Sequence, residues 1–393
     1  MTDFVPTHLS RAPGRVNLIG EHTDYNGLPV FPMALQREAR IELRPRDDGL
    51  VRLTNTDAEF PPVSFEIGVA IDKGPAGSWE NYVKAPAQEL ARRFAIYRGF
   101  DGVFTSDVPV ASGLSSSSAL VNSVGLALAV INEVGLDALA LAEVMADAER
   151  YTGTQGGGMD QAISMAARAG HAARIDFDPL RVKHVPIPDD WRFVVADTGV
   201  RAEKSGPAQG AYNRRRSECE EALVQVGAAL VRVGRVKVAP AGYQGLLRAV
   251  PARELLDHAE AALDGNLLRR FRHVVTEAAR VKKAQDALLL ADHAEFGMLM
   301  DASHGSLRVD YHVSSAELDE LVALAKEGGA AGARLTGAGF GGCIVALTSP
   351  ATVDEVLESL VSGYYEPRGM TERLDDHLFV AVPSEGASYR PLD

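Results

Sequence analysis

The chain has 393 residues, of which 46% are hydrophobic and 24% charged, and its formal net charge at pH 7 is −13. This length is typical of two globular domains rather than one core. The negative charge argues against binding to nucleic acid or to an anionic membrane surface. The two cysteines, Cys219 and Cys343, cannot form a disulfide framework. Since no signal peptide or membrane-spanning stretch is found in the sequence, we expect a cytoplasmic protein.

The first informative segment is the loop that follows a short apolar run at residues 16–19. It places Glu21, His22 and Asp24 close together, and Arg15 lies just before the run. An unpaired buried hydroxyl loses about 1–3 kcal/mol, so a ligand rich in hydroxyl groups requires such a cluster of directional donors and acceptors. A solvated hairpin turn is the alternative interpretation.

Two strands and a helix are predicted next. Alternation of apolar and polar residues predicts strands over residues 39–43 and 51–53, with a turn between them. Helical spacing predicts a helix over residues 79–94. Trp79 and Tyr82, at its start, form either core packing or a surface on which a planar ligand stacks, and composition favours the core.

The stretch from residue 108 to residue 131 is a loop of small residues that leads into an apolar helix. Glycine permits backbone angles that other residues avoid, and one serine hydroxyl is enough to cap a helix. Four consecutive serines are more than a cap requires and favour a second role, the binding of a chain of phosphate groups. Free N–H groups at a helix start can hold such a chain. An ordinary capped helix is the alternative. The loop residues concerned are Gly113, Leu114, Ser115, Ser116, Ser117 and Ser118.

A second helix is predicted over residues 137–151, with Glu149 at the edge of its apolar face. Three glycines at 156–158 then precede Asp160, which stands at the head of another apolar segment. Glycines allow the backbone to approach a ligand closely. The alternative is a flexible turn in which Asp160 caps a helix.

The composition of residues 179–190 suggests a domain boundary, which divides the chain into residues 1–190 and 191–393. A buried strand is predicted at residues 193–196, and a long helix from about Tyr212. Further helices are predicted over residues 253–263, 267–289 and 295–307.

A capping box formed by Ser314 and Glu317 predicts one more helix, which ends at residues 328–329. A second glycine loop follows at residues 335–342, before an apolar strand. A dinucleotide fingerprint would follow a strand instead, and no Walker or protein-kinase motif occurs in the sequence. Two glycine loops in different halves suggest one cleft between the domains.

Three motifs in order resemble those of the galactokinase branch of the GHMP small-molecule kinases. Residues 15–25 look like the galactokinase sugar signature, residues 109–119 like the ATP-phosphate loop, and residues 335–342 like the third motif. The resemblance covers nearly the whole chain. It implies an α/β (α+β) fold with an S5 domain 2-like N-terminal domain, a ferredoxin-like C-terminal domain and the active site between them.

The resemblance also implies roles for individual residues. Asp160 matches the catalytic aspartate of the family, and Arg15 matches its partner. The residues that match sugar contacts are Arg15, Glu21, His22, Asp24, Gly157, Asp160 and Tyr212. The residues that match ATP contacts are Trp79, Tyr82, Gly113, Leu114, Ser115, Ser116, Ser117, Ser118 and Gly339. The residues that match positions near Mg²⁺ are Ser117 and Glu149.

The implied reaction is transfer of the ATP γ-phosphoryl group to the anomeric hydroxyl of α-D-galactose, with Mg²⁺. We expect a monomer that binds galactose and ATP. Three features, the glycines at 156–158, Ser118 and Ala338, look more like the branch that contains animal N-acetylgalactosamine kinase and fungal galactokinases. An N-acetylgalactosamine or other sugar 1-kinase is therefore the alternative. A non-catalytic sugar and ATP sensor is the alternative of another class, although the intact loop at 115–119 argues against it.

Overall fold

The structure, a computed structural model, describes residues 4–153, 156–201 and 207–392. The chain forms two compact units. The first unit comprises Met1–Val16, Met33–Ala173 and Val382–Asp393, and the second comprises Asn17–Pro32 and Arg174–Ala381. These units are groups of residues in mutual contact, and each draws residues from both sides of position 190. The domain boundary at that position stays a prediction.

The first unit contains a six-stranded sheet with the order β12-β1-β2-β5-β3-β4. Its strands are β1 (His8–Asn17), β2 (Pro32–Pro45), β3 (Leu50–Asn55), β4 (Val63–Glu66), β5 (Phe100–Ser106) and β12 (Ser388–Pro391). In β2 the apolar Ile41 and Leu43 are buried, whereas Glu42 between them is exposed, as expected of a strand with one face on the core. The two predicted strands are confirmed, but they do not form a hairpin: β5 lies between them, antiparallel to β2 and parallel to β3.

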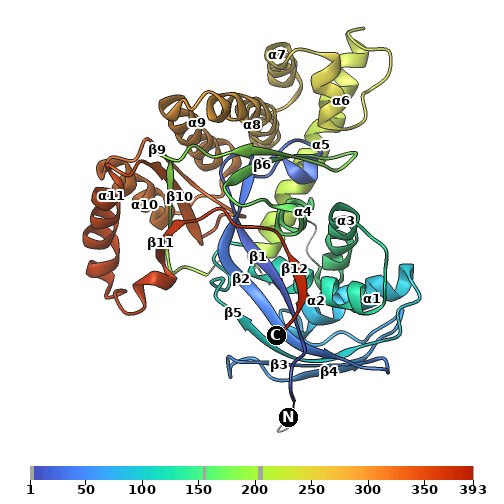
Figure 1. Ribbon diagram of the computed structural model, residues 1–393. Coiled ribbons are helices and arrows are strands. Elements are labelled where there is room, and N and C mark those ends of the chain that lie inside the picture. The colour runs from blue at the N-terminus through green and yellow to red at the C-terminus, as the bar shows by residue number, and fades with distance from the viewer. Residues whose placement is uncertain (1–3, 154–155, 202–206, 393) are drawn as a thin grey trace. The chain divides into compact units, whose positions relative to one another are not determined.

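Four helices belong to the same unit, and Figure 1 shows them grouped beside its sheet. They are α1 (Glu80–Arg93), α2 (Ser116–Ile131), α3 (Ala138–Glu149) and α4 (Met159–Ala166), and the 3-10 turn η2 (Arg150–Thr152) extends α3. Val121, Val124 and Leu128 on α2 are fully buried, at the spacing that predicted this helix. Helix α2 packs against α1, α3 and α4, so its first turn is held by neighbours on several sides.

The second unit contains a four-stranded antiparallel sheet with the order β11-β8-β10-β9. Its strands are β8 (Arg192–Asp197), β9 (Gly332–Leu335), β10 (Cys343–Thr348) and β11 (Leu378–Ala381), and β6 (His171–Asp176) and β7 (Arg181–Pro186) form a separate two-stranded ribbon. Every residue of β10 is buried, which explains its continuous apolar sequence.

The main helices of the second unit are α5 (Pro207–Arg232), α6 (Gly242–Ala249), α7 (Ala252–Ala262), α8 (Gly265–Leu289), α9 (His293–Ser306), α10 (Ala316–Glu327) and α11 (Val353–Leu360). The predicted helices are confirmed. The predicted capping box is wrong: the N-cap is Ser315, whose Oγ accepts the Leu318 N–H at 3.4 Å, while Ser314 Oγ donates to Asp319 at 2.5 Å. Because Leu318 has no side-chain acceptor, the helix begins with a simple serine cap. Throughout the residues that the structure describes, none of the helices combines the length and apolarity needed to cross a membrane.

Candidate functional site

A buried ion pair joins β1 to the first turn of α4 in the first unit. Arg15 Nη2 lies 2.6 Å from Asp160 Oδ1, and Arg15 Nε donates to the same oxygen at 2.7 Å. The two side chains are 4% and 14% exposed. Gly14 allows β1 to lie against Leu114, since a Cβ at Gly14 would be 2.8 Å from the Leu114 carbonyl oxygen, which accepts the Arg15 N–H at 3.1 Å. The fold therefore holds the predicted catalytic pair in direct contact.

The serine loop begins α2 in an unusual way. Ser115, at the N-cap position, has φ 65°, and its side chain makes no capping hydrogen bond. The alternative interpretation, an ordinary capped helix, does not fit this start, because Ser115 Oγ is buried and has no hydrogen-bond partner among the described residues. The first N–H groups of a helix have no intrahelical acceptor. Left uncapped, those of α2 are available to an anion.

Glu149, at the end of α3, connects the serine run to α4. Its Oε1 accepts hydrogen bonds from Ser118 Oγ at 3.0 Å and from Ser117 Oγ at 3.4 Å, and its Oε2 accepts one from Gln161 Nε2 at 2.8 Å. Ser118 Oγ also lies 3.5 Å from Asp160 Oδ2. Sequence reasoning missed Gln161, although it directly follows Asp160. The cluster thus sets two carboxylates beside the serine hydroxyls.

Trp79 and Tyr82 occupy different surroundings on α1. Trp79 is 7% exposed, its indole N–H donates to the Pro61 carbonyl at 2.9 Å, and its ring centroid lies 6.1 Å from that of Phe104. These contacts are those of a core tryptophan. Tyr82 is half-buried, and burial, followed by the charge of Glu149, raises its pKa. Tyr82 therefore lies nearer to the acidic cluster, and adenine contacts for both residues stay predictions.

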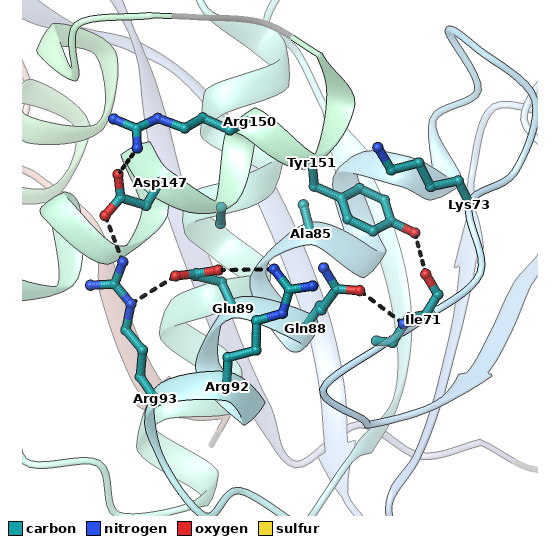
Figure 2. Close-up of a pocket in the computed structure, with 11 residues that line it drawn as sticks. Ile71, Lys73, Ala85, Gln88, Glu89, Arg92, Arg93, Asp147, Arg150 and Tyr151 are labelled. Atoms are coloured by element: carbon teal, nitrogen blue, oxygen red, sulfur yellow. Dashed lines mark hydrogen bonds and ion pairs between the residues drawn. The ribbon is translucent and has the colours of Figure 1, made fainter.

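A polar hollow of about 480 Å³ opens between α1 and the end of α3 (Figure 2). None of the eleven residues that line it is an expected site residue. Arg93 on its rim bonds both Glu89 at 2.7 Å and Asp147 at 2.5 Å, and Lys73 lies over the Tyr151 ring at 4.8 Å. Four cationic side chains, Lys73, Arg92, Arg93 and Arg150, line the hollow together with two carboxylates, Glu89 and Asp147, and the arginines pair with these carboxylates.

Four of the predicted sugar residues, Glu21, His22, Asp24 and Tyr212, lie in the second unit, whereas Arg15, Gly157 and Asp160 lie in the first. The His22 ring centroid is 5.8 Å from that of Tyr25, 5.7 Å from that of Tyr212 and 4.7 Å from that of Tyr311. His22 itself has φ 62°, an unusual conformation for a residue other than glycine. Asp24 begins the 3-10 turn η1 (Asp24–Asn26) and is half-buried. The fold thus brings Tyr212 from α5 into ring contact with His22, and sugar contacts of both residues stay predictions.

Glu21 is held inside a buried polar network. Its Oε1 accepts the Gly337 N–H, its Oε2 accepts the Asn17 side-chain amide, and Arg334 Nη2 lies 3.3 Å from Oε2. Glu21 and Arg334 are 2% and 0% exposed. A role for Arg334 was not predicted from the sequence. It could have been, because a single charged residue in an otherwise apolar strand requires a partner.

The two predicted glycines are placed differently. Gly339 has φ 77°, and a Cβ there would lie 2.3 Å from the Val313 carbonyl oxygen, so packing within the second unit alone requires glycine. Gly157 is half-buried and precedes α4, whose N-cap Gly158 has φ 98°. Contacts of Gly339 with phosphate and of Gly157 with sugar stay predictions.

Two buried histidines are held neutral in the second unit. Burial lowers the pKa of His22 well below its usual value, and it lowers the pKa of His273 to about 4. His273 Nε2 lies 3.1 Å from the Glu21 carbonyl oxygen, and Nδ1 lies 2.9 Å from Ser306 Oγ. Both rings are therefore uncharged at neutral pH.

Stability should fall in mild acid because of these histidines. Below pH 6.5 the unfolded chain protonates His273 while the folded protein does not, so acid favours unfolding. For His273 alone the free energy of unfolding should drop by about 2 kcal/mol between pH 6.5 and pH 5. Urea titrations at pH 7, 6 and 5 measure this drop. The His273→Gln variant is the control, because it lacks the contribution of this histidine to the drop. Equal pH dependence in both proteins would contradict a neutral His273.

These features together indicate a class of protein. Phosphoryl transfer depends on alignment of the reactants and on stabilisation of charge on the phosphoryl oxygens. The site supplies parts for both, namely an uncapped helix start, hydroxyls, carboxylates and an Arg–Asp pair. Family models agree: the GHMP kinase N-terminal domain matches residues 81–168, and the GHMP kinase C-terminal domain matches residues 284–366. The fold is therefore that of an ATP-dependent small-molecule kinase of the GHMP type.

More specific comparisons narrow the class. The galactokinase galactose-binding signature matches residues 3–45. The galactokinase of Chloroflexus aggregans is 42% identical over 93% of this chain and 90% of its own, and that of Roseiflexus sp. is 38% identical over 97% and 92%. The crystal structure of Lactococcus lactis galactokinase complexed with galactose is 32% identical, covers 97% of this chain and 95% of its own, and superposes with a TM-score of 0.84. The chain belongs to the galactokinase family.

Proposed function

We propose that this protein transfers the γ-phosphoryl group of ATP to the anomeric hydroxyl of α-D-galactose, giving galactose 1-phosphate and ADP. The observation that carries the proposal is the Arg15–Asp160 ion pair beside the uncapped start of α2. An acceptor for the hydroxyl proton and donors for the phosphate oxygens are thereby present in one unit.

Asp160 takes the proton of the anomeric hydroxyl, and Arg15 fixes the orientation of its carboxylate. A carboxylate beside a guanidinium remains ionised but is a weaker base than a free one. Proton transfer is therefore late, after the phosphoryl group has begun to move, and alignment supplies most of the acceleration. The uncapped N–H groups at the start of α2 bind phosphate oxygens.

The oxygens near Glu149 fit Mg²⁺. This ion prefers oxygen ligands and is usually held by one or two carboxylates together with substrate phosphates. Glu149 and Ser117 would hold it, and the ion would supply positive charge to the phosphate oxygens. Among the described residues no group of three or more His, Cys, Asp or Glu side chains forms a metal site.

The sugar is selected by Glu21, His22, Asp24 and Tyr212 in this proposal. Because a site built to hydrogen-bond a hydroxyl leaves its own groups unpaired when the wrong sugar binds, discrimination is strong. Position 2 of the sugar is different, because the glycines at 156–158 have no side chains. If they line that part of the pocket, larger substituents at this position are partly tolerated.

A coupled ADP-release assay over a panel of sugars tests the proposal. We expect galactose to have the highest kcat/KM, galactosamine a lower value, N-acetylgalactosamine a marginal one and glucose a very low one. A higher value for N-acetylgalactosamine than for galactose would replace galactose as the substrate. Glucose at the level of galactose would contradict the roles of Glu21, His22 and Asp24, and sugar binding without ADP release would indicate a sensor.

A further inference from the structure

The turn at residues 20–22 is a strained piece of backbone. Gly20 has φ 98° and His22 has φ 62°, so two of its three residues lie in the left-handed region. A Cβ at Gly20 would lie 2.8 Å from Val281 Cγ2 on α8 and 2.9 Å from the Val30 Cα, so the packing requires glycine there. For His22 the left-handed conformation is unfavourable, because the residue has a side chain. Such strain persists only where surrounding groups fix the backbone.

Helix α8 holds this turn through two polar side chains that lie four residues apart. Glu277 Oε1 accepts the Gly20 N–H at 2.9 Å. His273 Nε2 donates to the Glu21 carbonyl oxygen at 3.1 Å, since a carbonyl oxygen can only accept. Residues four apart lie on the same face of a helix. The amide at the start of the turn and the carbonyl that precedes His22 are therefore both held by one helix face.

Helix α9 supports the two side chains from the other side. Ser303 Oγ donates to Glu277 Oε1 at 2.6 Å, and Ser306 Oγ lies 2.9 Å from His273 Nδ1. Arg280 Nε donates to Glu277 Oε2 at 2.6 Å. Glu277 and His273 are both fully buried. A buried polar network in which each member has partners is rigid, so the two side chains form a fixed support for the turn.

The ion pair with Arg280 does not by itself explain why Glu277 is buried. The two residues are three apart on α8, and a pair with this spacing forms equally well on the exposed face of a helix. Burial of a carboxylate is unfavourable unless hydrogen bonds compensate it. The bonds that Glu277 receives from the Gly20 N–H and from Ser303 supply this compensation, and they exist only in the interior.

We propose that Glu277 and His273 are positioning residues that hold the turn at residues 20–22 in its strained form. They thereby fix the directions in which the side chains of Glu21 and His22 point. That these side chains contact the sugar rests on the proposed function. The anchoring itself does not, because it follows from hydrogen bonds within the second unit. When the turn relaxes, only the fraction of molecules that keeps the strained form binds the sugar, so the apparent affinity for the sugar falls.

Amide hydrogen exchange of the ligand-free protein, followed by NMR, tests the anchoring directly. Glu277→Ala removes the acceptor of the Gly20 N–H, so we expect this amide to exchange at least about tenfold faster, while the amides of β8 and β10 keep their protection. Glu277→Gln keeps an oxygen that accepts and should restore slow exchange. Unchanged exchange of the Gly20 amide in Glu277→Ala would overturn the proposal.

Asp101→Ala is the matched control. Asp101 is a carboxylate in the sheet of the first unit, 1% exposed and paired with Arg46 and Arg52. Its removal should lower the stability of the protein but leave the exchange of the Gly20 amide unchanged. Faster Gly20 exchange in this control, equal to that in Glu277→Ala, would mean that general destabilisation causes the effect, and would overturn the proposal.

Steady-state kinetics shows whether the anchored turn serves sugar binding. In Glu277→Ala and His273→Leu we expect the KM for galactose to rise about five- to thirtyfold, the range by which a left-handed residue disfavours the competent turn, with kcat and the KM for ATP within a factor of about two. A merely structural role would lower stability without separating the two KM values. Glu277→Gln should return the KM for galactose close to that of the unmodified protein. Equal KM values for galactose in Glu277→Ala and Asp101→Ala would contradict the positioning role.

Failure of this proposal and failure of the proposed function give different results. If the unmodified protein does not phosphorylate galactose, the proposed function is wrong, and the exchange of the Gly20 amide alone decides whether α8 anchors the turn. If galactose is phosphorylated but the Gly20 amide exchanges equally in Glu277→Ala and the unmodified protein, the function stands and the anchoring is wrong.

Discussion

Replacing Asp160 with Asn is expected to lower kcat for galactose by about two to four orders of magnitude, the usual range for the loss of a proton acceptor. The amide has nearly the same shape, and its oxygen can still accept from Arg15, whose Nε bonds Asp160 Oδ1 at 2.7 Å. The fold and the KM for ATP should therefore change little. Steady-state kinetics, together with a thermal unfolding curve of the variant, measures both parts of this expectation.

Asp147→Asn is the matched control for that experiment. Asp147 lies on α3 in the same unit and pairs with Arg93 and Arg150. Its substitution should leave kcat within a factor of about two, as is usual for a surface ion pair. Near-normal turnover in Asp160→Asn would refute the catalytic assignment of Asp160, whatever the control shows.

Replacing Arg334 with Met should lower the free energy of unfolding by about 3–5 kcal/mol, because removing one partner leaves a buried charge uncompensated. Arg334 is fully buried, donates to the Asn17 carbonyl at 2.8 Å and lies 3.3 Å from Glu21 Oε2. Glu21 would keep its bonds to neutral groups but lose its counter-charge. Urea titration at pH 7 measures the loss.

Two further variants show whether the loss comes from the unpaired charge. The double variant Arg334→Met with Glu21→Gln should recover part of the stability, since neither charge is then buried. Arg216→Met removes an arginine from an i,i+4 pair on α5, where Glu220 is 60% exposed, and should change stability by less than about 1 kcal/mol. A double variant less stable than Arg334→Met alone would show that the pair is not the source of the effect.

Helical periodicity predicted α1, α2 and α3 of the first unit, and a continuous apolar run predicted the buried strand β10. Val121, Val124 and Leu128 show why, because each lies at helical spacing and each is fully buried. Short-range patterns of this kind depend only on which face of an element meets a core. The position of β5 between β2 and β3 was not predicted, because strand order depends on contacts between residues far apart in the sequence.

The sequence by itself determined two candidate clusters, since the serine loop is one continuous stretch and Glu21, His22 and Asp24 lie together in another. Only the tertiary structure decided what their side chains contact. In the structure Arg15 pairs with Asp160, and the Ser115 side chain does not cap α2. Glu21 lies in hydrogen-bond contact with Arg334, which comes from a strand more than 300 residues further along the chain. The physical reason is that a buried polar group requires a partner, but the sequence does not state which distant residue supplies it.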